Sequence, residues 1–199
     1  MGQYRFWVSV VVVAAFSSIG SAQEETRNVF NARALNMGGG PTGATTNIQI
    51  TVDKWSSDGQ RQAMMNILKE KGHEAFIDGL HEMGQVGHAR ALGVAAGRAS
   101  PFPSTPFQFA YQFDRDGQRE VVMVAERPIS GREAASASQS LDYDTTVIIM
   151  NFPADDENAK GTGLLYRALK IRYDDEKEKL AVEQMGREPI RLTEITKVE

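Results

Sequence analysis

A run of alternating aromatic residues, followed by a tight-turn signal, constrains the fold of this chain more than any other feature. Aromatic residues occupy every second position from Phe107 to Phe113, which is the period of a β-strand with one buried face. Asp116-Gly117 favours the two-residue turn of a β-hairpin, and Arg119 to Glu126 supplies an apolar returning run. The sequence therefore predicts two antiparallel strands, with one face shared by Phe107, Phe109, Tyr111 and Phe113.

Other segments with strand character lie on both sides of this hairpin. Thr45 to Trp55 alternates between apolar and polar residues, and Thr145 to Phe152 is a nearly continuous apolar run that suits a strand buried on both faces. Between Leu192 and Ile195 the apolar residues change parity, which predicts a β-bulge. Shorter strands are expected within residues 29–35, 86–92, 162–173, 179–184 and 189–198.

Two helices are predicted between these strands. Gln60 to Lys71 carries its apolar residues on one helical face. Ser57 or Asp58 is placed to cap its start, and Gly72 to end it. His73 to Met83 forms the second helix, so the pair predicts a helical hairpin packed on the sheet.

Together these elements predict an α+β fold. The expected core is a mainly antiparallel sheet of about eight strands, either open or curled into a barrel or sandwich, with the two-helix hairpin packed on it. No repeat or linker divides residues 23–199, so a single α+β domain is expected there. The chain has no cysteine, and a domain without disulfides must be stabilised by its hydrophobic core.

The N-terminus has the three parts of a secretory signal peptide. Arg5 supplies a positive charge, residues 6–19 carry none, and the small residues Gly20 and Ala22 precede the polar Gln23. Because the uncharged stretch is shorter than the roughly 20 residues that span a bilayer as a helix, cleavage between Ala22 and Gln23 is favoured over an uncleaved anchor. We therefore expect a signal peptide over residues 1–22 and a soluble, secreted or periplasmic product without a stable membrane anchor, of bacterial origin.

Several classes of chemistry lack the residues that they need. Without cysteine there is no thiol catalysis or cysteine-ligated zinc, and no block of lysine and arginine is present to bind nucleic acid. Gly38-x-Gly40-x-x-Gly43 matches a dinucleotide fingerprint only formally, because a strand is predicted after it in place of a helix. No Gly-x-Ser-x-Gly occurs. The sequence therefore assigns no cofactor and no catalytic residue.

Four residues remain as candidates for a site. His73, His81 and His88 lie in one neighbourhood and have side chains suited to zinc, but their spacing fits no metal motif and a solvated helix face explains them better. Arg167 shares parity with Leu165, so a regular strand would turn it inward, towards a paired carboxylate or an anionic ligand. Structural pairing or a place at the sheet margin is favoured for Arg167, and no metal site is assigned.

Five short segments of the chain are distinctive: Trp55-Ser56-Ser57-Asp58, Glu126-Arg127-Pro128-Ile129, Leu141-Asp142-Tyr143, Lys170-Ile171-Arg172-Tyr173-Asp174 and Glu188-Pro189-Ile190-Arg191-Leu192-Thr193. Their arrangement resembles an uncharacterised family of exported bacterial proteins over most of residues 23–199. In that family an aromatic residue often follows the Arg-Pro-Ile segment, whereas this chain has Ser130-Gly131-Arg132. The family brings no established activity, so the resemblance implies export and assigns no functional residue.

Two functions stay open at the level of sequence. The favoured one is non-catalytic binding of a small ligand or an envelope partner, because no catalytic signature accompanies the β-rich domain. The alternative is a hydrolase-type enzyme with dispersed catalytic residues, in which His81 or His88 acts as general base. A closed apolar cavity near Phe109, Tyr111 and Arg167 in the structure would favour the binding function.

Overall fold

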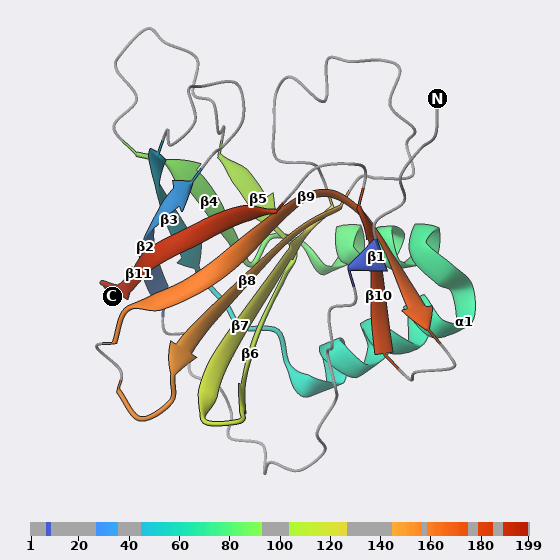
Figure 1. Ribbon diagram of the computed structural model, residues 1–199. Coiled ribbons are helices and arrows are strands. Elements are labelled where there is room, and N and C mark those ends of the chain that lie inside the picture. Colours follow the sequence, from blue (N-terminus) through green and yellow to red (C-terminus); the bar gives the residue numbers. More distant parts are fainter. Residues whose placement is uncertain are drawn as a thin grey trace, which may run out of the picture.

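The computed structural model describes residues 7–8, 27–35, 45–92, 104–126, 145–156, 159–174, 179–184 and 189–198. Within this part of the chain, eleven strands form one antiparallel sheet and one helix packs on it (Figure 1). The α+β class and the antiparallel sheet are thus as predicted, whereas the expected number of about eight strands is too low. The strands are β1 (Trp7–Val8), β2 (Asn28–Leu35), β3 (Thr45–Val52), β4 (Gly87–Ala91), β5 (Thr105–Phe107), β6 (Phe109–Arg115), β7 (Gln118–Ala125), β8 (Thr145–Pro153), β9 (Gly161–Asp174), β10 (Lys179–Gln184) and β11 (Ile190–Lys197).

The sheet curls into a nearly closed barrel. Its strands follow the order β5-β4-β3-β2-β11-β9-β8-β7-β6, and β10 extends it by pairing with β9 and with β1. The two ends of this order, β5 and β6, are separated in the chain only by Gln108. Gln108 N donates to the carbonyl of Val124 in β7, while Phe107 O accepts from Val86 beside β4. A bend at Gln108 therefore lets one stretch of chain pair with both ends of the sheet.

The barrel interior is filled by apolar side chains. Strand alternation sends every second residue inward, so that β3 contributes Ile48, Ile50 and Val52. Gly163, in β9, faces the same interior because a Cβ there would lie 3.2 Å from Cδ1 of Ile195. The largest fully buried members of this interior cluster are Ile48, Ile50, Phe107, Met123, Ile148, Met150, Leu165 and Leu192.

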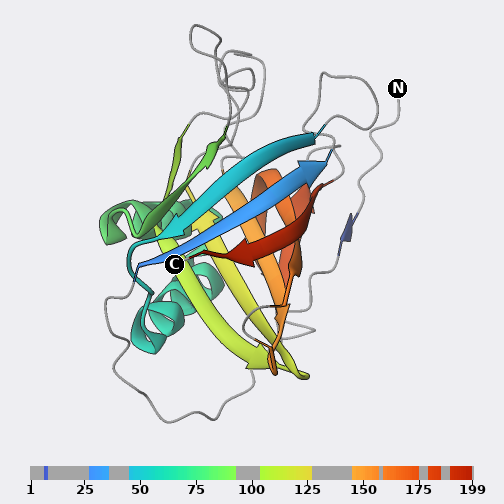
Figure 2. The ribbon, with the colours of Figure 1, turned by 90° about the vertical axis from the view of Figure 1, so that its left-hand side faces the viewer.

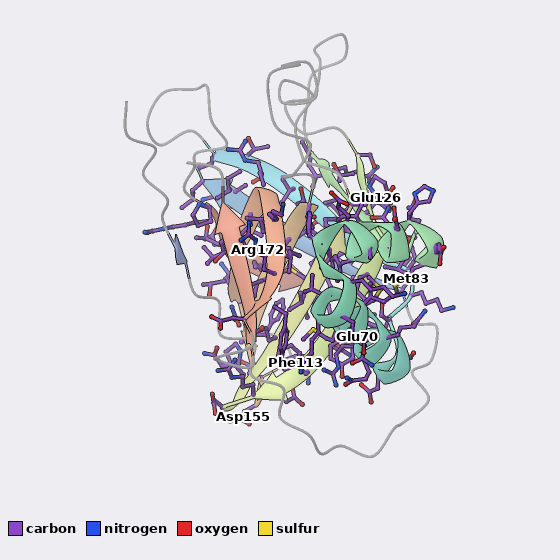
Figure 3. The ribbon with its side chains drawn as sticks, turned by 90° about the vertical axis from the view of Figure 1, so that its right-hand side faces the viewer. Glu70, Met83, Phe113, Glu126, Asp155 and Arg172 are labelled. Carbon is purple, nitrogen blue, oxygen red and sulfur yellow. The ribbon has the colours of Figure 1, made fainter. Side chains whose placement is uncertain are left out.

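A single helix, α1 (Asp58–Met83), covers the outer face of β6 to β9 (Figure 3). Ser57 and Gln60 form a reciprocal capping box at its start, which satisfies two backbone donors of the first turn. The predicted hairpin of two separate helices is not matched, because α1 is one element with a kink at Gly72 (φ 83°, ψ −168°). The kink folds the second half back on the first, since a Cβ at Gly79 would lie 3.2 Å from Sδ of Met64.

The helix buries a second apolar cluster against the outside of the barrel. Leu68 and Leu80 of α1 pack on this face, and they are 2% and 0% exposed. The sheet contributes Phe109, Val124, Val147, Ile149, Tyr166, Leu169 and Ile171. Because β8 faces the interior cluster on one side and α1 on the other, it is buried on both faces, as its continuous apolar run predicts.

Two irregularities reverse the predicted orientation of side chains. A register shift in the pairing of β8 with β9 separates Leu165, which lies in the interior cluster, from Leu169, which lies under α1. The regular alternation on which the predicted inward orientation of Arg167 depends is therefore interrupted between Tyr166 and Leu169, and Arg167 is half-buried. Likewise the bend at Gln108 leaves Phe107 inside the barrel but turns Phe109 to the outer cluster, so the four aromatic residues do not share one face.

Candidate functional site

The structure separates the three histidines. His73 is buried in α1, and its Nδ1 accepts a hydrogen bond from the backbone N–H of Ile171 at 3.2 Å. His81, in the last turn of α1, lies 3.0 Å from a carboxylate oxygen of Glu126. His88 is in β4 and lies 3.9 Å from Asp53. No group of three or more potential metal-ligating side chains occurs within the described residues.

A hydrolytic arrangement is incomplete around these histidines. His88 faces Thr51 across the β3–β4 pair, but the Thr51 hydroxyl is buried and makes no hydrogen bond within the described part of the chain. A nucleophile must contact both its base and its substrate, and a fully buried hydroxyl cannot meet the second condition. His81 and Glu126 form a closer pair, because their side chains are 3.0 Å apart whereas those of His88 and Asp53 are 3.9 Å apart.

Several residues considered from sequence lie outside the described part of the chain. These include the predicted cleavage residues Ala22 and Gln23 and the segments Gly38–Gly43 and Leu141-Asp142-Tyr143. Ser130-Gly131-Arg132 also lies outside it. Within the described residues, α1 is not long and apolar enough to cross a membrane, and no other helix occurs there.

A ligand cannot enter the barrel as it does in hollow ligand-binding barrels. Ala34, Ile48, Ile50 and Leu192 are at most 1% exposed, and protein interiors of this kind are close-packed. Phe109 and Tyr111 lie on the outer face, under or beside α1. Among the described residues, the surfaces that a ligand could reach therefore lie on the outside of the barrel.

One outer face is polar and is not covered by α1. It is formed by β4, β3, β2 and β11, which face the viewer in Figure 2. Across it, Arg90 donates from Nε and Nη2 to Oε1 of Gln49 at 3.2 and 2.7 Å, and Gln49 Nε2 donates to Oδ1 of Asn31 at 3.3 Å. These three residues are neighbours in the strand register, so the hydrogen bonds hold them in one row.

A shallow pocket of about 190 Å³ opens next to this row. Its charged lining residues are Arg33 and Glu194, whose guanidinium and carboxylate groups lie 3.4 Å apart. Glu194 also lies 3.7 Å from Lys160. Glu194 has a positive φ of 51° and lies in the β-bulge of β11 between Leu192 and Ile195, which confirms the bulge predicted from sequence. The pocket is lined by Asn31, Ala32, Arg33, Asn47, Leu92 and Glu194.

The pocket combines neutral amides with an ion pair at the surface. Asn31 and Asn47 each offer an amide donor and acceptor, and Arg33 offers a planar set of N–H donors. Two cations, Arg33 and Lys160, share the single carboxylate of Glu194. This part of the face therefore has an excess of positive charge and many hydrogen-bonding groups.

The opposite outer face carries aromatic residues beside α1. Rings of Phe109, Tyr111 and Phe113 follow one another at centroid distances of 6.2 and 6.1 Å. The Tyr111 hydroxyl donates to Asp58 Oδ1, and the Arg61 guanidinium lies 5.3 Å from the Tyr111 ring centroid. Burial, followed by the hydrogen bond to Asp58, raises the pKa of Tyr111. The hydroxyl accordingly stays protonated and serves as a donor.

Sequence reasoning overlooked the pocket, although part of its pattern was visible. Asn47 and Gln49 occupy the polar parity of the predicted strand over residues 45–55. Asn31 and Arg33 show the same alternation in β2. Which polar faces lie side by side depends on the strand order, which a single sequence does not show.

The chain matches no protein-family model, no curated protein and no solved structure.

Proposed function

We propose that this protein is an exported, non-catalytic binding protein that holds a small hydroxylated anion, such as a sugar acid, in the pocket on its polar face. The observation that carries the proposal is the placement of Arg33, Asn31 and Asn47 around one opening of about 190 Å³. The signal-like N-terminus supports a role outside the cytoplasm, and the packed barrel interior favours a site on the outer surface.

The size and polarity of the pocket define the ligand. Drug-sized ligands occupy pockets of roughly 300–1,000 Å³, so this smaller opening suits one sugar-sized unit. Amide side chains pair with hydroxyl groups because each provides both a donor and an acceptor. Leu92 supplies an apolar contact at the edge.

The charges favour an anion over a neutral sugar. Arg33 can bind a carboxylate in a bidentate manner, and Lys160 can take over the pairing with Glu194 when Arg33 turns to the ligand. Arg90, fixed by Gln49, adds positive charge to the same face. A carboxylate ligand therefore meets a pre-formed positive field.

Nuclear magnetic resonance titration tests this proposal with three matched sugars: glucuronate, glucose and glucosamine. We expect glucuronate to shift backbone amide signals of β2, β3 and β11 with the lowest Kd, and Arg33→Met to raise that Kd by about tenfold or more. Arg119→Met is the matched control, because Arg119 pairs with Asp114 at a different end of the barrel. Equal affinity for the three sugars would contradict the proposed ligand class.

Export has its own test. We expect the protein recovered from a bacterial periplasm or culture medium to begin at Gln23 when its N-terminus is sequenced. An intact N-terminus in a membrane fraction would instead support the uncleaved anchor.

A hydrolase-type enzyme remains the second candidate because His81 and Glu126 form a carboxylate–histidine dyad at 3.0 Å. Such a dyad can orient a general base. If the protein hydrolyses an activated ester such as p-nitrophenyl acetate, His81→Gln should remove that activity, whereas His88→Gln should not.

A further inference from the structure

A second candidate site lies on the opposite outer face of the barrel, on the strands that α1 packs against. Phe113, Glu120 and Asn151 are directly opposite one another on β6, β7 and β8. They share the outer face, because their neighbours Val121 and Met150 point into the barrel. All three are half-buried. Figure 3 shows Phe113 between α1 and the end of the sheet near Asp155.

Glu120 has no hydrogen-bond or ion-pair partner within the described part of the chain. Burial raises the pKa of its carboxyl group, and the nearby charge of Arg115 opposes this shift to a smaller extent. Arg115 itself lies 3.4 Å from Asp116. A half-buried carboxylate without a partner costs free energy of folding, and such groups are concentrated at functional sites.

On the same outer face, two aromatic rings already contact cationic side chains of the protein. The guanidinium of Arg61 lies 5.3 Å from the centroid of Tyr111, and Nζ of Lys69 lies 5.1 Å from the centroid of Tyr173. Both cations come from the first half of α1. These distances are those of cation–π contacts.

Phe113 repeats this arrangement without a cation over its ring within the described residues. Next to Tyr111, a ring, a cation and a carboxylate come together, because the Tyr111 hydroxyl also contacts Asp58. Next to Phe113, the ring and the carboxylate of Glu120 are present, and the cation nearest to this carboxylate, Arg115, is engaged with Asp116. No lysine or arginine of the described residues lies over the Phe113 ring.

We propose that Phe113, Glu120 and Asn151 form a binding site for an organic cation, a primary ammonium or guanidinium group. The cation lies against the Phe113 ring, and the carboxylate of Glu120 neutralises its charge. The side-chain amide oxygen of Asn151 accepts a hydrogen bond from one of the N–H groups of the cation. This ligand class is opposite in charge to the sugar acid proposed for the pocket, and the two sites lie on different faces of the barrel. Each can therefore be present without the other.

Isotope-labelled protein titrated with two amines tests the site. N-acetyl-lysine methylamide represents a lysine side chain of a partner, and putrescine represents a free amine. We expect either to shift amide signals around Phe113, Glu120 and Asn151, while acetate does not. Stronger binding of the lysine derivative indicates a protein partner, and stronger binding of putrescine a metabolite.

Two variants separate binding from folding. Glu120→Gln keeps the shape of the side chain but removes its charge, so the Kd for the preferred amine should rise by about tenfold or more. Phe113→Leu keeps an apolar side chain but removes the ring, and should also weaken binding. Asp114→Asn, on the opposite face of β6 and paired with Arg119, is the matched control and should leave the Kd unchanged.

Acidification supplies a further readout. Amine binding should weaken as the pH falls through the raised pKa of Glu120, and this dependence should be absent in Glu120→Gln. The site would be ruled out if neither amine shifts these signals in a folded protein, or if Glu120→Gln binds the amine as tightly as the unaltered chain.

Discussion

The hydroxyl of Tyr111, in the middle of β6, donates a hydrogen bond to Oδ1 of Asp58, in the first turn of α1. This contact ties the start of the helix to the barrel, and the Arg61 guanidinium covers the ring of the same tyrosine. We expect Tyr111→Phe to retain the ring contacts and to lower the free energy of unfolding by about 1 kcal/mol. Urea denaturation measures the change, and Asp58→Asn, which keeps an acceptor oxygen, should cost less.

Glu120 should destabilise the protein at neutral pH. Its pKa is raised by burial, so the folded state binds its proton more tightly than the unfolded state does. The contribution of Glu120 to the free energy of unfolding is therefore greatest at pH values below its pKa in the unfolded state. This contribution is lost as the pH rises through its pKa in the folded state. We expect Glu120→Gln to raise the melting temperature at pH 7 and to have little effect near pH 4. A melting temperature lowered at both pH values would show that the carboxylate stabilises the fold.

Gly87 is required by the close approach of two strands. It lies opposite Val52 in the pairing of β4 with β3, and a Cβ at this position would overlap the carbonyl oxygen of Thr51. Gly87→Ala should therefore separate the strands and destabilise the protein by about 2 kcal/mol. Gly84→Ala is a useful comparison, because nothing lies near its Cβ but its φ of 72° disfavours a side chain. Its cost should come from the backbone, and chemical shifts of β3 should stay unchanged.

The sequence predicted local elements well because their signals are local. The Asp116-Gly117 hairpin is confirmed, with positive φ values of 51° and 73° at the two turn residues. The strand predicted within residues 45–55 is found over residues 45–52, and the doubly buried strand predicted over residues 145–152 is found over residues 145–153. Each depends only on residues within a few positions of one another.

Long-range features could not be read in the same way. Regular alternation would put Leu165 and Leu169 on one face, but the register shift between them puts Leu165 in the barrel interior and Leu169 under α1. The bend at Gln108, which joins the two ends of the barrel, contains neither glycine nor proline. The pocket at Arg33 and Asn47 needs β2 beside β3 and β11 beside β2, and this order is decided by packing of the whole barrel.

The packed interior leads to a last prediction about the barrel. Leu192, in β11, is 1% exposed and contacts the interior cluster. Leu192→Ala would leave a void that the surrounding strands cannot fill, so we expect a loss of about 3 kcal/mol in the free energy of unfolding. Val198→Ala is the control, because Val198 follows the same strand but is 50% exposed and should change stability by less than about 0.5 kcal/mol. Because a hollow, ligand-filled barrel would tolerate truncation at Leu192, a small loss there would contradict the close packing of the barrel interior, on which the proposal of an outer binding site depends.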